Sequence, residues 1–340
     1  MSSKGSYIVV GENIHCTRIR MTSGKFVETD PSGRSFLVFK DRGVPARLPI
    51  PELFTSSDDW KNGKIRHVAA AIYQGMRGSA EERAAGESYL AAMVREQEAA
   101  GAWFLDVNVD EYSLELDDKL AAVEWAVEVL QRYATVPLSI DSSDTRLLAA
   151  ALGRCDTSKG KPLVNSVSLE RAAMIPLAAR SGACVIAGAT GEALMPEGVE
   201  ERVDNIRTLV RRLAAEGFAL GDIFLDPLVM PVSVNTENGK VVIEAVRRLR
   251  AEYGKDIHFA PGLSNVSFGL PRRPLINQVF AKLCLEAGCD GGIVDPAQIN
   301  DRSLASLDLS SGPAALARDL LLGQDEYGLA WISSCRDAQG

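Results

Sequence analysis

The sequence predicts a (β/α)8 barrel, or TIM barrel, formed by a single chain of 340 residues. Eight short apolar segments rich in β-branched residues alternate with longer segments of helical periodicity, a pattern typical of parallel α/β folds. Eight such units in one domain favour a closed barrel. An open doubly wound sheet is the alternative, but it usually carries a glycine-rich phosphate loop after its first strand. The segment Gly11-Glu-Asn-Ile-His15 is not such a loop.

The strands are expected where short apolar runs end in polar residues: Tyr7–Glu12, Trp103–Val109, Pro137–Asp141, Leu163–Ser168, Cys184–Ala189, Ile223–Leu228, His258–Leu263 and Gly291–Asp295. A helical segment follows each strand, for example Leu114–Arg132 and Val199–Glu216. Glycine adopts the left-handed conformation without strain, so it commonly ends helices. Four glycines are expected in that role: Gly101, Gly182, Gly217 and Gly288.

One connection is far longer than the others. About 65 residues separate the first strand from the helix opened by the capping-box sequence Ser79-Ala-Glu-Glu82, whereas an ordinary βα loop has roughly two to six. Residues 14–78 are therefore expected to be an insertion within one domain of residues 1–340. A βα insertion emerges at the catalytic face of a barrel, where it could be a lid or a docking surface. Extra packing or a dimer contact is the alternative.

Three parts are expected within this insertion. The first is a hairpin, in which Lys25–Thr29 and Arg34–Lys40 flank the turn sequence Asp30-Pro-Ser-Gly33. The second is a connector with prolines at positions 45, 49 and 51, and the third is an amphipathic helix near Trp60–Met76.

Composition and charge exclude several classes of protein. A net charge of −8 and a pI near 5.2 provide no general attraction to nucleic acid or to an anionic membrane. The N-terminus lacks the apolar core of a signal peptide, and no run approaches 18 apolar residues, so we expect a soluble cytoplasmic protein. The six cysteines have neither metal-site nor disulfide-framework spacing, which predicts buried reduced thiols.

Carboxylates and amides recur at the predicted strand ends. The set comprises Glu12, Asp106, Asn108, Asp141, Asn165, Asp226 and Asn265. Buried polar groups of this kind are unfavourable unless they are paired, so the set indicates a polar ligand at the carboxyl ends of the strands. Asp141, Asn165 and Asp226 suit a planar ligand rich in N–H donors, such as the amino-oxo-pyrimidine edge of a pterin. Capping of loops or helix starts is the alternative, with Asp141 and Ser143 as possible N-caps.

Other chemistries fit the sequence less well. The three histidines, at positions 15, 67 and 258, are scattered without metal-ligand spacing, so no metal site is predicted. Aromatic residues make up only 6% of the chain, which leaves few platforms for the sugar of a glycosidase substrate. No Gly-x-Ser-x-Gly sequence supports acyl transfer.

Several motifs run in order along nearly the whole chain: Gly11-Glu12-x-Ile14, Asp106-x-Asn108-Val109, Leu138-x-Ile140-Asp141-Ser142, Asn165-Ser166, Asp226-Pro227-Leu228-Val229-x-Pro231, Gly262-Leu-Ser-Asn265-Val-Ser267 and Arg273-Pro-Leu-Ile-Asn277. Together they resemble the methyltetrahydrofolate:corrinoid methyltransferases. This family belongs to the pterin-binding superfamily that includes dihydropteroate synthase and the folate module of cobalamin-dependent methionine synthase.

The resemblance implies a barrel that binds the pterin of a folate and moves a methyl group between its N5 and cobalt. Tetrahydrofolate and 5-methyltetrahydrofolate would be substrates, and a partner corrinoid protein would carry the cobalamin, since the chain has no Asp-x-His-x-x-Gly motif. Asn265 would assist catalysis at N5. The pterin site would comprise Asp141, Asn165 and Asp226 together with Glu12, Asp106, Asn108, Gly262 and Ser264. A homodimer is expected.

Two alternatives remain beside this hypothesis. A dihydropteroate synthase-like enzyme would need a basic pyrophosphate site, yet the eighth strand ends in Asp295-Pro-Ala-Gln298 without a basic residue. A non-catalytic folate-binding protein is the other alternative, because a fold alone does not establish chemistry. The chain also departs from the family pattern at His15, where relatives often have asparagine, and in Gly188–Pro196, which lacks a common lysine. These departures bear on the direction of transfer and on the methyl donor.

Overall fold

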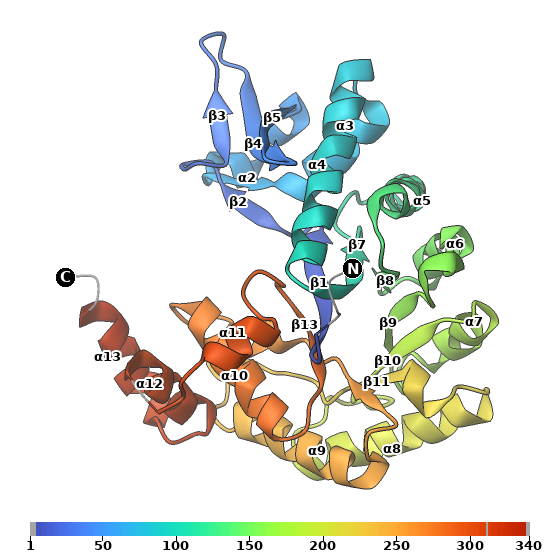
Figure 1. Cartoon of the computed structure of the whole chain (residues 1–340), viewed down its shortest axis with the longest axis vertical. Helices are drawn as coiled ribbons and strands as arrows, with labels where there is room; N and C mark the ends of the chain where they lie inside the picture. The colour runs from blue at the N-terminus through green and yellow to red at the C-terminus, as the bar shows by residue number, and fades with distance from the viewer. Residues whose placement is uncertain (1–4, 311, 338–340) are drawn as a thin grey trace. The chain divides into compact units, whose positions relative to one another are not determined.

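The computed structural model describes residues 5–310 and 312–337 and confirms the (β/α)8 fold (Figure 1). The first four residues of the N-terminus considered above lie outside the described residues. Eight strands form one sheet in the order β12-β11-β10-β9-β8-β7-β1-β13. A parallel bridge between Gly262, just after β12, and Ile293 in β13 brings the first and last strands of that order together.

The chain forms two compact units. Unit 1 comprises residues 1–10, 101–103 and 163–340, and unit 2 comprises residues 11–100 and 104–162. Two of the four divisions fall inside strands of the sheet, between Val10 and Gly11 and between Trp103 and Phe104. They are therefore not linkers between successive domains, and a single domain over residues 1–340 stays a prediction.

All eight predicted strands are present. Their bounds are β1 Ile8–His15, β7 Ala102–Asn108, β8 Leu138–Asp141, β9 Leu163–Val167, β10 Cys184–Gly188, β11 Ile223–Asp226, β12 His258–Phe259 and β13 Gly291–Val294. The largest difference concerns β12, which was expected to reach Leu263. It ends early because the chain turns at Pro261 and then forms the short 3₁₀ helix η4, Leu263–Ser267.

Helices follow the strands as expected. In unit 2 they are α3 His67–Arg77, α4 Ala80–Ala99, α5 Leu116–Tyr133 and α6 Thr145–Arg154. In unit 1 they include α7 Ile175–Arg180, α8 Val199–Ala215, α9 Asn238–Tyr253, α10 Arg273–Glu286, α11 Asp301–Ser306, α12 Gly312–Leu321 and α13 Leu329–Asp337. The capping box of α4 is confirmed, with Ser79 and Glu82 bonding reciprocally. The four predicted helix-ending glycines all have positive φ, between 61° and 106°.

The insertion in unit 2 contains more β-structure than the sequence indicated. The hairpin is confirmed: β3 Val27–Thr29 pairs with β4 Ser35–Asp41, and the Asp30 side chain accepts the N–H groups of Ser32 and Arg34. The expected proline connector is instead a third strand, β5 Val44–Pro49, on the edge of this sheet. Proline is tolerated there because an edge strand leaves one row of N–H groups unpaired.

The helix expected from Trp60 begins later. A short helix, α2 Asp58–Lys61, is followed by β6 Lys64–Arg66, which pairs with β2 Ile19–Met21. Only then does α3 begin, at His67. A further short helix, α1 Glu52–Thr55, precedes α2. The helical periodicity of the sequence spans this interruption, so periodicity alone could not locate it.

Each unit has its own apolar core. In unit 1 the fully buried side chains include Tyr7, Phe259, Phe280 and Trp331, and in unit 2 they include Ile14, Leu37, Leu48, Leu90 and Leu105. Truncating such a leucine to alanine costs about 2–5 kcal/mol of unfolding free energy. All six cysteines are free and five of them are buried, as predicted. Among the described residues, no helix combines the length and apolar character needed to span a bilayer.

Candidate functional site

Three polar residues of unit 2, of which Asp106 is buried and the other two are half-buried, form a compact cluster at or near the ends of their strands. His15 is the last residue of β1, Asp106 lies in β7 and Asp141 ends β8. His15 Nε2 lies 2.8 Å from Asp106 Oδ2, and the Asp106 side chain is completely buried. One ligand atom from each of the three residues lies within 4.8 Å of the others.

Asn108 holds the third member of this cluster in place. Its Nδ2 donates a hydrogen bond of 2.8 Å to Asp141 Oδ2, and its Oδ1 accepts the backbone N–H of Asp110 at 3.0 Å. Both bonds fix the orientation of the amide. In the pairing of β7 with β8, Val107 lies opposite Ile140. The next residues of the two strands, Asn108 and Asp141, therefore lie side by side.

Repulsion between the negative charges of Asp106 and Asp141 affects the pKa values in the cluster. Burial and the neighbouring Asp106 raise the pKa of Asp141 to about 7, against smaller opposing effects of His15 and Asn108. Burial alone would lower the pKa of His15, but the hydrogen bond and charge of Asp106 outweigh it, so that pKa is raised. The cluster therefore favours a protonated histidine beside two acidic groups.

The neighbours of the cluster are already engaged. Glu12 forms an ion pair of 2.7 Å with Arg18, whose Nε also donates to the Glu12 backbone carbonyl. Asp110 accepts hydrogen bonds from the Ser142 hydroxyl and from the backbone N–H of Ser143. These bonds brace the turn between β8 and α6.

The capping alternative for Asp141 and Ser143 is wrong. The N-cap of α6 is Asp144, whose side chain accepts the N–H of Arg146 at 2.8 Å. Asp141 precedes the helix by several residues and bonds to Asn108 instead.

In unit 1, Asp226 ends β11 and is held by backbone N–H groups. Its Oδ1 accepts the N–H of Leu228 at 2.8 Å, and the N–H of Gly262 also bonds to the carboxylate. Burial raises the pKa of Asp226 to about 6, while these N–H donors and Arg202 act in the opposite direction. Arg202 is buried and donates to the carbonyls of Pro227, Glu197 and Gly198. These bonds fix its guanidinium next to Pro227, the first residue after β11.

Asn265 lies in the 3₁₀ turn that replaces the end of β12. Gly262 precedes the turn, and a Cβ at that position would lie 3.0 Å from Asn265 Nδ2. The Arg273 guanidinium ties the turn down from α10, donating to the Ser264 carbonyl at 2.9 Å and to the Ser267 hydroxyl at 3.0 Å. Glycine thus allows the Asn265 amide to lie against the backbone, and arginine stabilises that conformation.

The predicted site residues lie in both units, within the strands of the sheet or in the segments that follow them. Glu12, Asp106, Asn108 and Asp141 lie in unit 2, whereas Asn165, Asp226, Gly262, Ser264 and Asn265 lie in unit 1. Asn165 is a half-buried residue of β9. Contact of Asp141, Asn165 and Asp226 with one ligand stays a prediction.

His15 was not predicted as a site residue, and neither was Arg202. A lone histidine carries little signal in a sequence, although its place at a strand end is the same as that of the acidic residues. Arg202 shows only as one of several basic residues on a helix, so its burial could not be inferred. Spacing along the sequence does not reveal the cluster of His15, Asp106 and Asp141, because three different strands bring these residues together.

The cluster of His15, Asp106 and Asp141 has the composition of a divalent-cation site. In this structure His15 bonds to Asp106, and Asp141 bonds to Asn108. A cation would have to replace the proton between His15 and Asp106, and it would compete with the Asn108 amide for Asp141.

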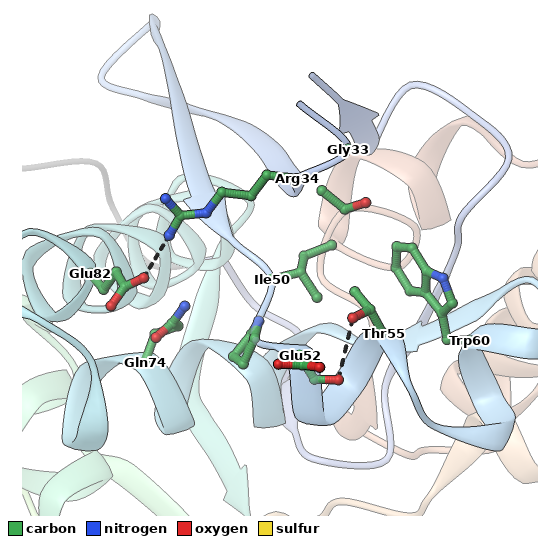
Figure 2. Close-up of a pocket in the computed structure, with 10 residues that line it drawn as sticks. Gly33, Arg34, Ile50, Glu52, Thr55, Trp60, Gln74 and Glu82 are labelled. Carbon is green, nitrogen blue, oxygen red and sulfur yellow. Dashed lines mark hydrogen bonds and ion pairs between the residues drawn. The ribbon is translucent and has the colours of Figure 1, made fainter. Parts of the chain in front are cut away.

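A separate pocket lies within unit 2. It is lined by residues of the insertion and by Glu82 of α4 (Figure 2). It has a volume of about 400 Å³ and is lined by residues that include Ile50, Trp60 and Gln74. Its wall is braced by an ion pair of 2.6 Å between Arg34 and Glu82 and by a hydrogen bond from Gln74 to the Pro49 carbonyl. None of the predicted site residues lines it.

The chain is similar to several known proteins. The family model described as "Pterin binding enzyme" matches residues 80–295. The methylcorrinoid:tetrahydrofolate methyltransferase of Eubacterium limosum is 33% identical over 272 residues, which cover 78% of this chain and 89% of that protein. The methionine synthase of Mycobacterium tuberculosis is 30% identical over 226 residues, which cover 61% of this chain and 18% of that much longer protein.

A solved structure supports the fold. The dihydropteroate synthase of Stenotrophomonas maltophilia has a TM-score of 0.52 at 15% identity, covering 65% of this chain and 86% of that one. At this identity the likeness concerns the barrel rather than the reaction. The family match extends over more than half of the chain, and the 33% identity covers most of both proteins. The chain belongs to the family of pterin-binding enzymes.

Proposed function

We propose that the chain is a methyltransferase that moves a methyl group between N5 of tetrahydrofolate and the cobalt of a corrinoid carried by a partner protein. The observation that carries this proposal is the 33% identity to the methylcorrinoid:tetrahydrofolate methyltransferase over most of both chains. The polar strand ends support it, since they supply carboxylates and amides suited to a pterin.

In the direction towards folate, the lone pair of N5 attacks the methyl carbon of a methylated corrinoid. The carbon–cobalt bond breaks and its electron pair stays on cobalt, which leaves as cob(I)alamin. The new C–N bond forms and the proton on N5 is released. In the opposite direction N5 must first be protonated or hydrogen-bonded, because tetrahydrofolate is otherwise a poor leaving group.

The pterin is held by Asp141, Asn165 and Asp226 in this proposal. A carboxylate that accepts two N–H groups from the pterin forms a strong charge-assisted pair. The backbone N–H groups of Leu228 and Gly262 fix Asp226 beforehand, which lowers the entropy lost on binding. Glu12, Asp106, Asn108, Gly262 and Ser264 complete the pterin site in this proposal. Of these, Asn108 bonds to Asp141 and the Gly262 N–H bonds to Asp226.

Asn265 assists the reaction at N5. An amide can donate a hydrogen bond to N5 without taking a net charge, and the bond can strengthen as the transition state forms. The turn that holds Asn265 is fixed by Gly262 and Arg273, so the donor is preorganised.

Residues 14–78 shape the surface on which the corrinoid protein docks or close over bound folate, with a dimer contact as the alternative. Exposed apolar side chains in this insertion support a contact role; Met21, Val44 and Leu53 are each more than half exposed. We also propose a homodimer located in the cytoplasm, where free cysteines stay reduced.

No specific observation favours a dihydropteroate synthase. In the loop after β13, Asp295 accepts hydrogen bonds from the Ala297 N–H and the Gln298 amide, and no basic side chain lies between these residues. A non-catalytic folate-binding protein is the remaining alternative, and only an activity measurement separates it from the methyltransferase.

The test is an anaerobic reaction of the purified protein with tetrahydrofolate and ¹³C-methylcobalamin. We expect the cob(I)alamin absorbance to rise while ¹³C-labelled 5-methyltetrahydrofolate forms in equal amount, as followed by mass spectrometry. Binding of tetrahydrofolate without turnover, even with millimolar methylcobalamin, would support the binding protein. Formation of 7,8-dihydropteroate from its precursors would support the synthase instead.

A further inference from the structure

Two acidic side chains lie close together on neighbouring strands of unit 2. Asp106 in β7 is completely buried, Asp141 ends the neighbouring strand β8, and His15 from β1 lies against Asp106 at 2.8 Å. Two carboxylates this close, away from water, cannot both be ionised without a compensating positive charge. One of them otherwise takes up a proton.

His15 is placed to supply that charge. The charged groups that act on its imidazole are Asp106 and Asp141, which favour the protonated form, and Arg18, which opposes it. Arg18 itself is paired with Glu12, and α4 contributes the neutral Gln97, bonded to the Asn13 N–H. Asp110 adds a further negative charge near Asp141. The balance around His15 is therefore acidic.

We propose that the imidazolium of His15 is a positioning group that keeps Asp106 and Asp141 ionised together, so that tetrahydrofolate binding at Asp141 depends on a proton held at His15. The identity of the ligand rests on the proposed function; the coupling between the three side chains does not. Asp141 accepts two N–H groups of a pterin only as a carboxylate, because its protonated form spends one oxygen as a donor.

The direction of the pH dependence follows from this arrangement. The pKa of Asp141 is raised to about 7 even with His15 lowering it, so removal of the imidazolium must raise it further. In the wild-type protein, folate affinity increases with pH as Asp141 ionises. It levels off at higher pH, once Asp141 is fully ionised.

The first experiment compares the wild type with His15→Gln and with a matched control. Glutamine can still donate a hydrogen bond to Asp106 but carries no charge. The control is His258→Gln, which removes the other histidine–aspartate pair, His258 with Asp290 at 2.8 Å. Titration calorimetry with tetrahydrofolate is carried out between about pH 5.5 and 9, the range over which histidine and a raised carboxyl titrate.

For His15→Gln we expect the rising limb of the profile to move up by about one pH unit, which lowers the affinity about fivefold at pH 7 and about tenfold well below it. His258→Gln should leave the profile unchanged. Equal loss of affinity at every pH would overturn the proposal, because it would show a purely structural role. Binding of Mn²⁺ by the wild type that is abolished in His15→Gln would also overturn it, in favour of a cation site.

A second experiment needs no folate. The chain has three histidines, so the imidazole signal of His15 can be assigned by its absence from the spectrum of His15→Gln. We expect the titration midpoint of this signal to fall in Asp141→Asn, because a neighbouring anion has been removed. An unchanged midpoint would overturn the charge coupling. Failure of methyl transfer alone would refute the proposed function and leave this coupling intact.

Discussion

Asp141 and Asp226 occupy equivalent places at the ends of their strands, but their surroundings differ. Asp226 in unit 1 accepts backbone N–H groups from Leu228 and Gly262 and lies near the buried cation of Arg202. Asp141 in unit 2 accepts one amide hydrogen bond from Asn108 and faces a second carboxylate, Asp106. The pKa is raised in both, to about 6 for Asp226 and about 7 for Asp141.

The comparison shows that one residue type can serve two purposes. Backbone donors make the position and charge of Asp226 part of the fold. The charge of Asp141 depends on groups that can themselves gain or lose protons. We therefore expect changes at Asp226 to alter folate binding at all pH values, and changes at Asp141 to alter its dependence on pH.

The largest expected effect is on folate affinity at Asp226. Asp226→Ala should remove a charge-assisted bond to a buried ligand, which costs about 2–4 kcal/mol of binding free energy. Calorimetric titration with tetrahydrofolate measures this loss, and Asp141→Ala serves as the partner variant. If neither substitution changes the affinity, the assignment of these residues to the pterin site is wrong.

A second prediction separates binding from chemistry. Asn265→Ala should lower the rate of methyl transfer roughly 10²-fold or more at saturating folate, since a preorganised donor acts mainly in the transition state. Its effect on the folate dissociation constant should be much smaller. Single-turnover measurement of cob(I)alamin formation provides the rate. A variant that binds folate weakly but transfers methyl groups at the normal rate when saturated would contradict this role.

The third prediction concerns the stability of the free protein, and it contrasts the two aspartates directly. A buried carboxyl whose pKa is raised binds a proton more tightly in the folded state than in the unfolded state, so its contribution to stability falls as pH rises through this range. Asp141→Asn should therefore raise the unfolding free energy at pH 8 by about 1–3 kcal/mol, after allowance for relaxation.

Asp226→Asn should not stabilise the protein in this way. Its carboxylate accepts two backbone N–H groups, and an asparagine offers them one oxygen where the carboxylate offers two. Denaturant unfolding of both variants at pH 5 and pH 8 tests the contrast. Equal stabilisation by the two substitutions would show that the backbone donors at Asp226 matter less than the geometry indicates.

Much of the barrel could be predicted because buried parallel strands form continuous apolar runs. The ends of β7, β8 and β11 fall within a few residues of the predicted positions, and their polar residues were identified as candidates. The partner of His15 could not be predicted, because 91 residues separate it from Asp106 and no periodicity connects them. The early end of β12 is a matter of turn chemistry at Pro261 and Gly262, which an apolar run does not reveal.

The smallest expected effect concerns the insertion and the corrinoid partner. Removing the whole hairpin would be uninformative, because β4 carries the fully buried Leu37 and packs Phe39 against Tyr89. Surface substitutions avoid this difficulty: Val44 and Leu53 are 64% and 60% exposed, so Val44→Lys with Leu53→Lys should leave the fold intact.

If this surface binds the corrinoid protein, KM for that protein should rise about fivefold, as expected for the loss of about 1 kcal/mol of contact energy. Folate affinity should stay the same, and Leu285→Lys on α10, at 36% exposure, is the matched control. A double variant that converts a dimer into a monomer by light scattering, with normal transfer kinetics, would show that the insertion is a subunit contact instead.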